Sequence, residues 1–181
     1  MCTVSYLPKG KRRFILTSNI DERIARKTIH PTGYSVGNQT LFFPKDAEAG
    51  GTWIAASANG RVCCLLNGAF EKHERKTTYG KSRGIIALEA FEYGRIADFF
   101  KTVELNDVEP FTLIVVEPTA IAQLYELRWD GNKKHLVEKK NSTPHIWSSA
   151  TLYSKHARKS REEWFAKWLT QQHVMEREQV L

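Results

Sequence analysis

The sequence begins MCTVSYLPKGKRRFILTSNIDE (residues 1–22), and this stretch predicts a β-hairpin at the start of the fold. Residues 2–7 and 14–18 are rich in the apolar and β-branched side chains that strands favour. The segment between them, residues 8–11, is typical of a turn because Gly10 can adopt a positive φ at little cost. Pairing of the two strands brings Cys2 close to Asn19 and Asp21, so we treat these three residues as one candidate site.

Cys2 is a candidate nucleophile because it can combine a thiol with a base on the same residue. If Met1 is removed, Cys2 carries a free α-amine, whose pKa of about 7.7–8.0 allows it to take the thiol proton near neutral pH. Considered alone, a cysteine at position 2 is more often incidental. Other motifs along the chain shift this balance towards chemistry.

These motifs follow Cys2-Thr3 in order: Asn19-Ile20-Asp21-Glu22, Gly50-Gly51-Thr52-Trp53, and Asn59-Gly60-Arg61 leading to Leu66-Asn67. Their order and spacing resemble the transport and Golgi organisation protein 2 family, which has a characteristic Asn-Arg-Asp-Glu motif. That family is similar in turn to the choloylglycine hydrolase branch of the N-terminal-nucleophile hydrolases. The resemblance runs from residue 1 to about residue 153.

The resemblance implies an α+β fold, an αββα sandwich of two antiparallel sheets flanked by helices, in a single domain over residues 1–181. It implies that Cys2 is the nucleophile, that Asp21 lies beside its α-amine, and that the Asn67 side chain donates to the oxyanion of a tetrahedral intermediate. By the same resemblance, Asn19 and Ser149 bind the substrate. Without it, Asp21 and Asn67 would be interpreted as residues that stabilise a turn and a strand end.

The sequence departs from the resembled proteins at three positions. Ser18 stands where choloylglycine hydrolases place an arginine, Ile20 stands where the Asn-Arg-Asp-Glu motif places one, and Ser149 stands where an asparagine is usual. An isoleucine can neither pair with a carboxylate nor donate a hydrogen bond. The chain also ends at Leu181, where the resembled proteins continue into further strands, so we expect part of the second sheet to be absent.

Along the rest of the chain the pattern is strands, then helices, then strands, then a helix, which fits two sheets with helices outside them. Residues 22–40 show no periodicity and are expected to form a loop before a short strand over residues 41–43. Asn59-Gly60 predicts a type I′ hairpin turn. The next strand, residues 61–67, is apolar on both faces and must therefore be covered on both sides. Later strands are expected over residues 111–117, 122–129, 136–139 and 146–148.

Two helical regions are expected. Ser82 is a candidate N-cap for a helix from residue 83 to about residue 93, and a second helical piece follows over residues 96–102. From about Ser154, apolar side chains again recur at helical spacing. We expect Trp164, Phe165, Trp168 and Leu169 to be mostly buried against a sheet.

Composition bounds the function classes. The net charge of +7 suits an acidic small-molecule substrate or ligand, and nucleic-acid binding is disfavoured because no zinc-finger, helix-turn-helix or base-stacking motif accompanies it. No apolar run reaches the length of a membrane span, and the N-terminus lacks the pattern of a signal peptide. The three cysteines do not form a disulfide framework, and Cys63 and Cys64 are interpreted as buried apolar residues. We therefore expect a cytoplasmic protein without a cofactor or metal, and the sequence indicates no oligomeric state.

Two functions remain open. One is an amide (C–N bond) hydrolase that uses Cys2, which a retained Met1 would exclude by blocking the α-amine. The other, also implied by the resemblance, is a non-catalytic binding or trafficking protein for haem, lipid or acyl-coenzyme A-type ligands. Ligand binding would then survive the Cys2→Ala substitution, and Ile20 and Ser149 would be the reasons that catalysis was lost.

Overall fold

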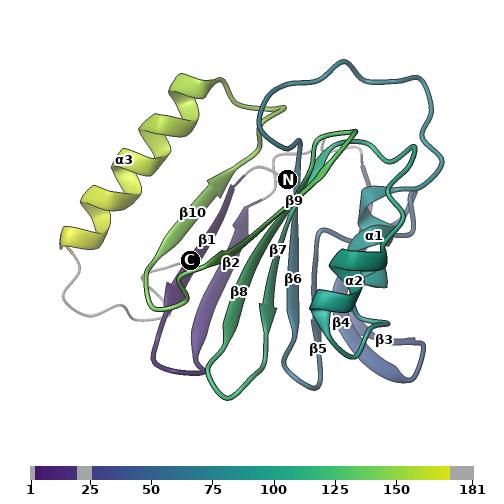
Figure 1. The fold of residues 1–181 in the computed structure, drawn as a ribbon, viewed down its shortest axis with the longest axis horizontal. Helices are drawn as coiled ribbons and strands as arrows, with labels where there is room; N and C mark the ends of the chain where they lie inside the picture. The colour runs from purple at the N-terminus through teal and green to yellow at the C-terminus, as the bar shows by residue number, and fades with distance from the viewer. Residues whose placement is uncertain (1–2, 20–25, 172–181) are drawn as a thin grey trace.

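A computed structural model describes residues 3–19 and 26–171 and shows a layered α+β fold (Figure 1). The elements in chain order are β1 (Thr3–Pro8), β2 (Phe14–Asn19), β3 (Thr28–Val36), β4 (Gln39–Asp46), β5 (Ile54–Ser57), β6 (Val62–Asn67), α1 (Arg83–Glu89), α2 (Ile96–Thr102), β7 (Phe111–Glu117), β8 (Gln123–Trp129), β9 (Lys134–Lys139), β10 (His145–Ser148) and α3 (Lys155–Gln171).

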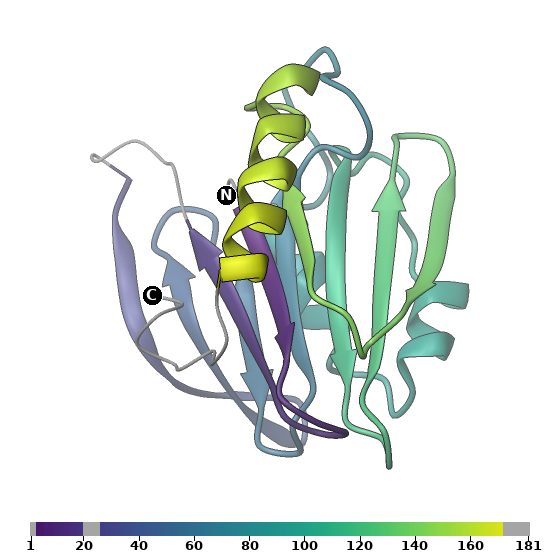
Figure 2. The same ribbon diagram turned by 90° about the vertical axis from the view of Figure 1, so that its left-hand side faces the viewer.

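The strands form two antiparallel sheets. A seven-stranded sheet has the order β3-β4-β5-β6-β7-β8-β9, and a three-stranded sheet has the order β10-β1-β2. Helices α1 and α2 cover one face of the large sheet, and the small sheet packs on its other face (Figure 1). Helix α3 lies over the outer face of the small sheet (Figure 2). The predicted αββα sandwich is confirmed, with a second sheet of three strands within the described residues.

Strand β6 shows why the fold needs two cores. Cys63 and Leu65 pack against the helices, whereas Cys64 and Leu66 pack between the two sheets. All four side chains are buried, as the continuous apolar run of this strand predicts. Burial raises the pKa of the Cys64 thiol to about 12 and raises that of Cys63 as well, so both behave as apolar core residues.

The expectation of a loop over residues 22–40 is wrong for its described part. Residues 28–36 form β3, and β4 begins at Gln39. Strand β3 lies at the edge of the sheet and is almost wholly exposed, so it lacks the apolar alternation that marks a half-buried strand. Pro31 is tolerated because the strand is an edge strand, and the pairing register shifts between Ile29 and Thr32.

The hairpin at Asn59-Gly60 is confirmed, but the predicted turn type is wrong. Gly60 has a φ of 95°, whereas Asn59 does not have a positive φ. The Gly60 N–H donates to the Ser57 carbonyl at 2.9 Å, and the Ser57 N–H donates to the Arg61 carbonyl at 2.9 Å. This pattern is that of a type I turn followed by a glycine bulge, which needs only one positive φ.

Arg61 explains why α1 ends at Glu89 rather than near residue 93. Its buried guanidinium donates to the carbonyls of Ala90 and Tyr93 at 2.7 Å each and to that of Gly94 at 3.0 Å. Nε and Nη2 also bind the two carboxylate oxygens of Glu117 at 3.0 and 2.8 Å. The carbonyls after α1 are therefore satisfied without a further helical turn. At the other end, the Ser82 hydroxyl accepts from the Gly84 N–H, as predicted for an N-cap.

The expected burial of α3 is wrong. None of its described residues is buried, and Trp164 is 67% exposed. The Phe165 and Trp168 rings stack on each other at 6.0 Å and are half-buried. The three-stranded sheet offers α3 a narrow surface, mainly along β10, so one side of the helix stays open.

Within residues 3–19 and 26–171, no helix is long and apolar enough to cross a membrane. No group of His, Cys, Asp and Glu side chains in this part of the chain could hold a metal ion.

Candidate functional site

The corner at the end of β6 holds Asn67 in a fixed position. Asn67 pairs with Phe111 of β7, and the next residue, Gly68, turns the chain with a φ of 81°. The Gly68 N–H donates to the Pro110 carbonyl at 3.0 Å, and the Gly68 carbonyl accepts from the Thr112 hydroxyl at 2.9 Å. A side chain at position 68 would be strained at this φ and would collide with Thr151. The backbone at Asn67 and Gly68 is thus held by strand pairing and hydrogen bonds.

Ser149 holds the backbone of this corner through a hydrogen bond. It is fully buried, and its hydroxyl donates to the Asn67 carbonyl at 2.8 Å and lies 3.1 Å from the Thr151 hydroxyl. The structure therefore places Ser149 against the backbone of Asn67. Its predicted role in substrate binding remains a prediction.

The start of the N-terminal hairpin lies at the same end of the sheets as Asn67. Thr3 pairs with Asn19 on one side and with Ser148 on the other, and Ser148 precedes the serine that holds Asn67. The predicted pairing of the first two strands is confirmed. Cys2 and Asp21, like Ile20, lie outside the described residues, so their predicted roles rest on the sequence. Asn19 is exposed at the end of β2.

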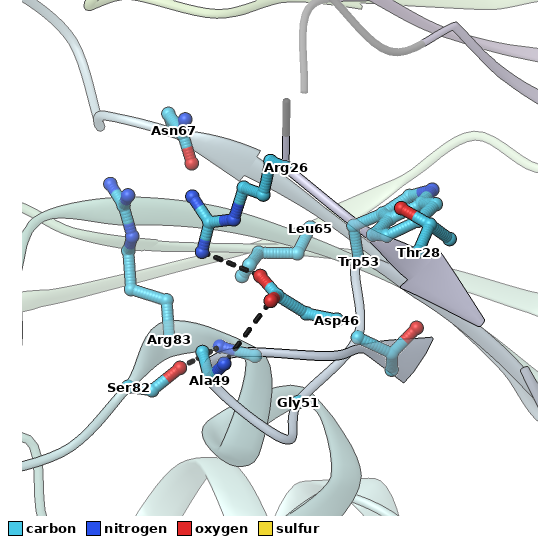
Figure 3. Close-up of a pocket in the computed structure, with 12 residues that line it drawn as sticks. Arg26, Thr28, Asp46, Ala49, Gly51, Trp53, Leu65, Asn67, Ser82 and Arg83 are labelled. Atoms are coloured by element: carbon cyan, nitrogen blue, oxygen red, sulfur yellow. Dashed lines mark hydrogen bonds and ion pairs between the residues drawn. The ribbon is translucent and has the colours of Figure 1, made fainter. Parts of the chain in front are cut away.

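Asn67 also lines a pocket of about 130 Å³ (Figure 3). The other lining residues come from the start of β3, the turn between β4 and β5, β6 and the start of α1: Arg26, Thr28, Asp46, Ala49, Gly51, Thr52, Trp53, Leu65, Ser82, Arg83 and Gly84. No described residue forms a hydrogen bond with the Asn67 side-chain amide, and Figure 3 shows it beside the guanidinium groups of Arg26 and Arg83. A polar amide in this position is suited to meet a ligand.

Asp46 organises one wall of the pocket. One carboxylate oxygen, Oδ1, accepts from the N–H groups of Glu48 and Ala49 at 2.9 and 3.1 Å, and the other, Oδ2, lies 2.5 Å from Nη2 of Arg26. Burial raises the pKa of Asp46, but the hydrogen bonds from Ala49, Arg26 and Glu48 outweigh it and hold the pKa below its usual value. Asp46 is therefore a charged anchor for Arg26 at neutral pH.

Arg83 forms the opposite wall. Its Nη2 lies 3.1 Å from Oε2 of Glu109, and its Nη1 donates to the Pro110 carbonyl at 3.3 Å. The same Pro110 carbonyl accepts from Gly68, so the Arg83 side chain and the Asn67 corner share an anchor. The Glu109 carboxylate also lies 3.2 Å from His73 and 3.8 Å from Arg75.

Glycines bring these walls together. A Cβ at Gly51 would lie 2.6 Å from the Gly84 carbonyl carbon, and a Cβ at Gly84 would lie 2.8 Å from the Thr52 nitrogen. The start of α1 can therefore approach the turn after β4 only because both positions are glycine. The Gly50-Gly51-Thr52-Trp53 motif thus shapes the pocket, and Trp53 contributes its indole ring (Figure 3).

Sequence reasoning identified Asn67 and missed the two arginines. Arg83 was visible only as the residue after a helix N-cap, and Arg26 lay in a segment expected to be a loop. A signal was present for Arg26, which lies close to the Asn19-Ile20-Asp21-Glu22 motif in the sequence, but none was present for Arg83. Both side chains line the pocket at the end of β6 because the segment just before β3 and the start of α1 come together there.

The fold is similar to those of a conjugated bile acid hydrolase and a penicillin V acylase. A variant of conjugated bile acid hydrolase from Clostridium perfringens matches with a TM-score of 0.56 and 7% identity, over 91% of this chain and 57% of that one. Penicillin V acylase from Agrobacterium tumefaciens matches with a TM-score of 0.54 and 7% identity, over 92% of this chain and 57% of that one. The chain thus spans little more than half the length of these structures, and at this identity the similarity concerns the fold alone.

No curated protein matches the chain. The family model described as Transport and Golgi organisation 2 matches residues 1–181, the full length of the sequence. This match shows that the chain belongs to the Transport and Golgi organisation 2 family.

Proposed function

We propose that this protein is an N-terminal-nucleophile hydrolase that cleaves an amide bond of a small molecule with Cys2. The observation that carries the proposal is the Asn67 corner. Its side-chain amide faces a pocket, its backbone is fixed by Ser149, Pro110 and the β7 pairing, and it lies at the end of the sheets where β1 begins. A rigid donor of this kind is what an oxyanion requires.

The proposed reaction has two steps. The Cys2 thiol gives its proton to the α-amine, and the sulfur attacks the amide carbon, so that the carbonyl oxygen becomes an oxyanion that accepts from Asn67. The C–N bond then breaks, the leaving amine takes the proton from the α-ammonium, and a thioester remains on Cys2. Water attacks the thioester, releases the carboxylic acid and restores the thiol. Asp21 holds the α-amine in position.

The test is turnover of a panel of short N-acyl amides by protein whose mass shows that Met1 has been removed. The Cys2→Ala variant should lose turnover completely, and Asn67→Ala should retain the fold while losing about 10² to 10³ in rate. Asn38→Ala is the matched control, because Asn38 is an exposed asparagine in the turn between β3 and β4. Turnover that survives Cys2→Ala contradicts the proposal. Ligand binding without any turnover supports the alternative, a binding protein of the same fold.

A further inference from the structure

We infer that the pocket beside Asn67 recognises an anionic group on the ligand, a carboxylate or a phosphate, through Arg26 and Arg83. The inference deepens the proposed function, because it rests on that function for the amide bond next to Asn67. The anion recognition itself rests on the described pocket alone.

The two guanidinium groups are fixed in place. Asp46 holds Arg26 with an N–O distance of 2.5 Å, and Glu109 and the Pro110 carbonyl hold Arg83. Figure 3 shows both guanidinium groups directed to the side of the pocket where the Asn67 amide lies. Pre-positioned guanidinium groups match the paired oxygens of carboxylates and phosphates, and they lose little freedom on binding.

The described lining of the pocket carries more positive than negative charge. Among the lining residues that the structure describes, Arg26 and Arg83 carry positive charge and Asp46 carries negative charge. Glu109 lies behind Arg83 and is shared with His73 and with the exposed Arg75. Among the described residues, the guanidinium groups of Arg26, Arg75 and Arg83 thus share the carboxylates of Asp46 and Glu109, and an anionic ligand can form charge-assisted hydrogen bonds with Arg26 and Arg83.

The remaining lining sets the size and polarity of the ligand. Trp53 and Leu65 provide an apolar side, and the volume of about 130 Å³ suits a small group. A short acyl chain linked through an amide to a small acid would place its charge at the arginines and its amide at Asn67. An uncharged analogue of the same size would form no charge-assisted hydrogen bond with these arginines.

The experiment measures binding to the Cys2→Ala protein by calorimetry. Three matched probes differ only in the end group: N-hexanoylglycine, N-hexanoylaminomethylphosphonate and the uncharged N-hexanoylglycinamide. At least one anionic probe should bind about tenfold or more tightly than the amide, as expected for charge-assisted hydrogen bonds. The carboxylate and phosphonate arms show which acid fits better.

Variants assign the preference to the pocket. Arg26→Gln should reduce the preference for anionic probes several-fold. Arg83→Lys keeps the charge but loses the paired N–H donors of the guanidinium, so it should also reduce this preference. Arg12→Gln removes the same charge from the exposed turn between β1 and β2 and should leave the preference unchanged. If Arg83→Lys does not fold, Arg26→Gln decides alone, because the Arg26 side chain is more exposed.

Equal binding of all three probes, failure of all three to bind, or a preference that Arg26→Gln does not change would overturn the inference. If the wild-type protein turns over charged and uncharged amides equally well, the inference of anion recognition is overturned while the proposed hydrolase is sustained. A preference for anionic probes without any turnover by the wild-type protein would sustain the inference of anion recognition and overturn the proposed hydrolase function.

Discussion

The two ends of strand β6 carry motif residues with opposite environments. Just before its start, Arg61 is 3% exposed, and its guanidinium is satisfied by Glu117 and by three backbone carbonyls. At its end, Asn67 has a pinned backbone, but its side-chain amide faces a pocket and has no described partner. Residues of one motif thus divide into those that hold the fold and those that face a ligand.

The difference teaches how to interpret a conspicuous polar residue. A buried group whose hydrogen bonds are all made within the chain has its role in stability. A rigidly held group left without a partner beside a cavity is available for chemistry. Arg61 and Asn67 should therefore respond to substitution in different assays.

Arg61→Met should give the largest loss of stability. It leaves the Glu117 carboxylate and the carbonyls after α1 without partners in a buried site, which costs about 3–5 kcal/mol in the free energy of unfolding. Urea denaturation measures the loss, and Arg12→Met at an exposed turn is the control. A loss below about 1 kcal/mol would show that Arg61 does not hold the end of α1.

Asp46 should make stability depend on pH at the pocket end. Its pKa is lowered in the folded state, so its stabilising effect is fully present above the unfolded-state pKa of about 3.9 and is lost as the pH falls further. Asp46→Asn keeps an oxygen for the Glu48 and Ala49 N–H groups but loses the charge that binds Arg26.

Urea midpoints at pH 7 and pH 3 test this effect. The wild-type protein should lose more stability between the two pH values than Asp46→Asn, by less than about 1 kcal/mol because Arg26 is partly exposed. Identical losses in the two proteins would contradict the role of the Asp46 charge.

Trp164→Ser should have the smallest effect. The side chain is 67% exposed, so its removal should change the free energy of unfolding by no more than about 0.5 kcal/mol. Thermal unfolding measures this change, and Trp147→Ser, which removes a buried ring between the sheets, is the contrasting variant. A loss above about 2 kcal/mol for Trp164→Ser would show that α3 packs more tightly than described.

Local patterns in the sequence predicted most of the fold. The hairpin at residues 3–19, the doubly covered strand β6, the Ser82 cap and helix α2 all follow from side-chain pattern and turn chemistry. Strand β3 could not be predicted in this way, because an exposed edge strand has no periodic pattern of apolar residues. The exposure of α3 could not be predicted either. It depends on the width of the neighbouring sheet, which no local pattern encodes.

The candidate site was predictable in one part only. Asn67 follows from the resemblance and from its place at a strand end. Arg26, Asp46 and Arg83 line the same pocket only because the segment before β3, the end of β4 and the start of α1 come together in the folded chain. Such a convergence depends on long-range pairing, which a single sequence does not reveal. The position of Cys2 relative to Asn67 remains a prediction from the sequence.

The most direct test of the central claim is single-turnover acylation by p-nitrophenyl acetate, followed by release of p-nitrophenolate and by peptide mass mapping. The account predicts that the acetyl group appears on Cys2 and that Asn67→Ala slows acylation by about 10² to 10³ while its urea midpoint stays close to that of the wild-type protein. Acetylation at another residue, or an unchanged rate in Asn67→Ala, would contradict the claim that Asn67 faces the reacting group.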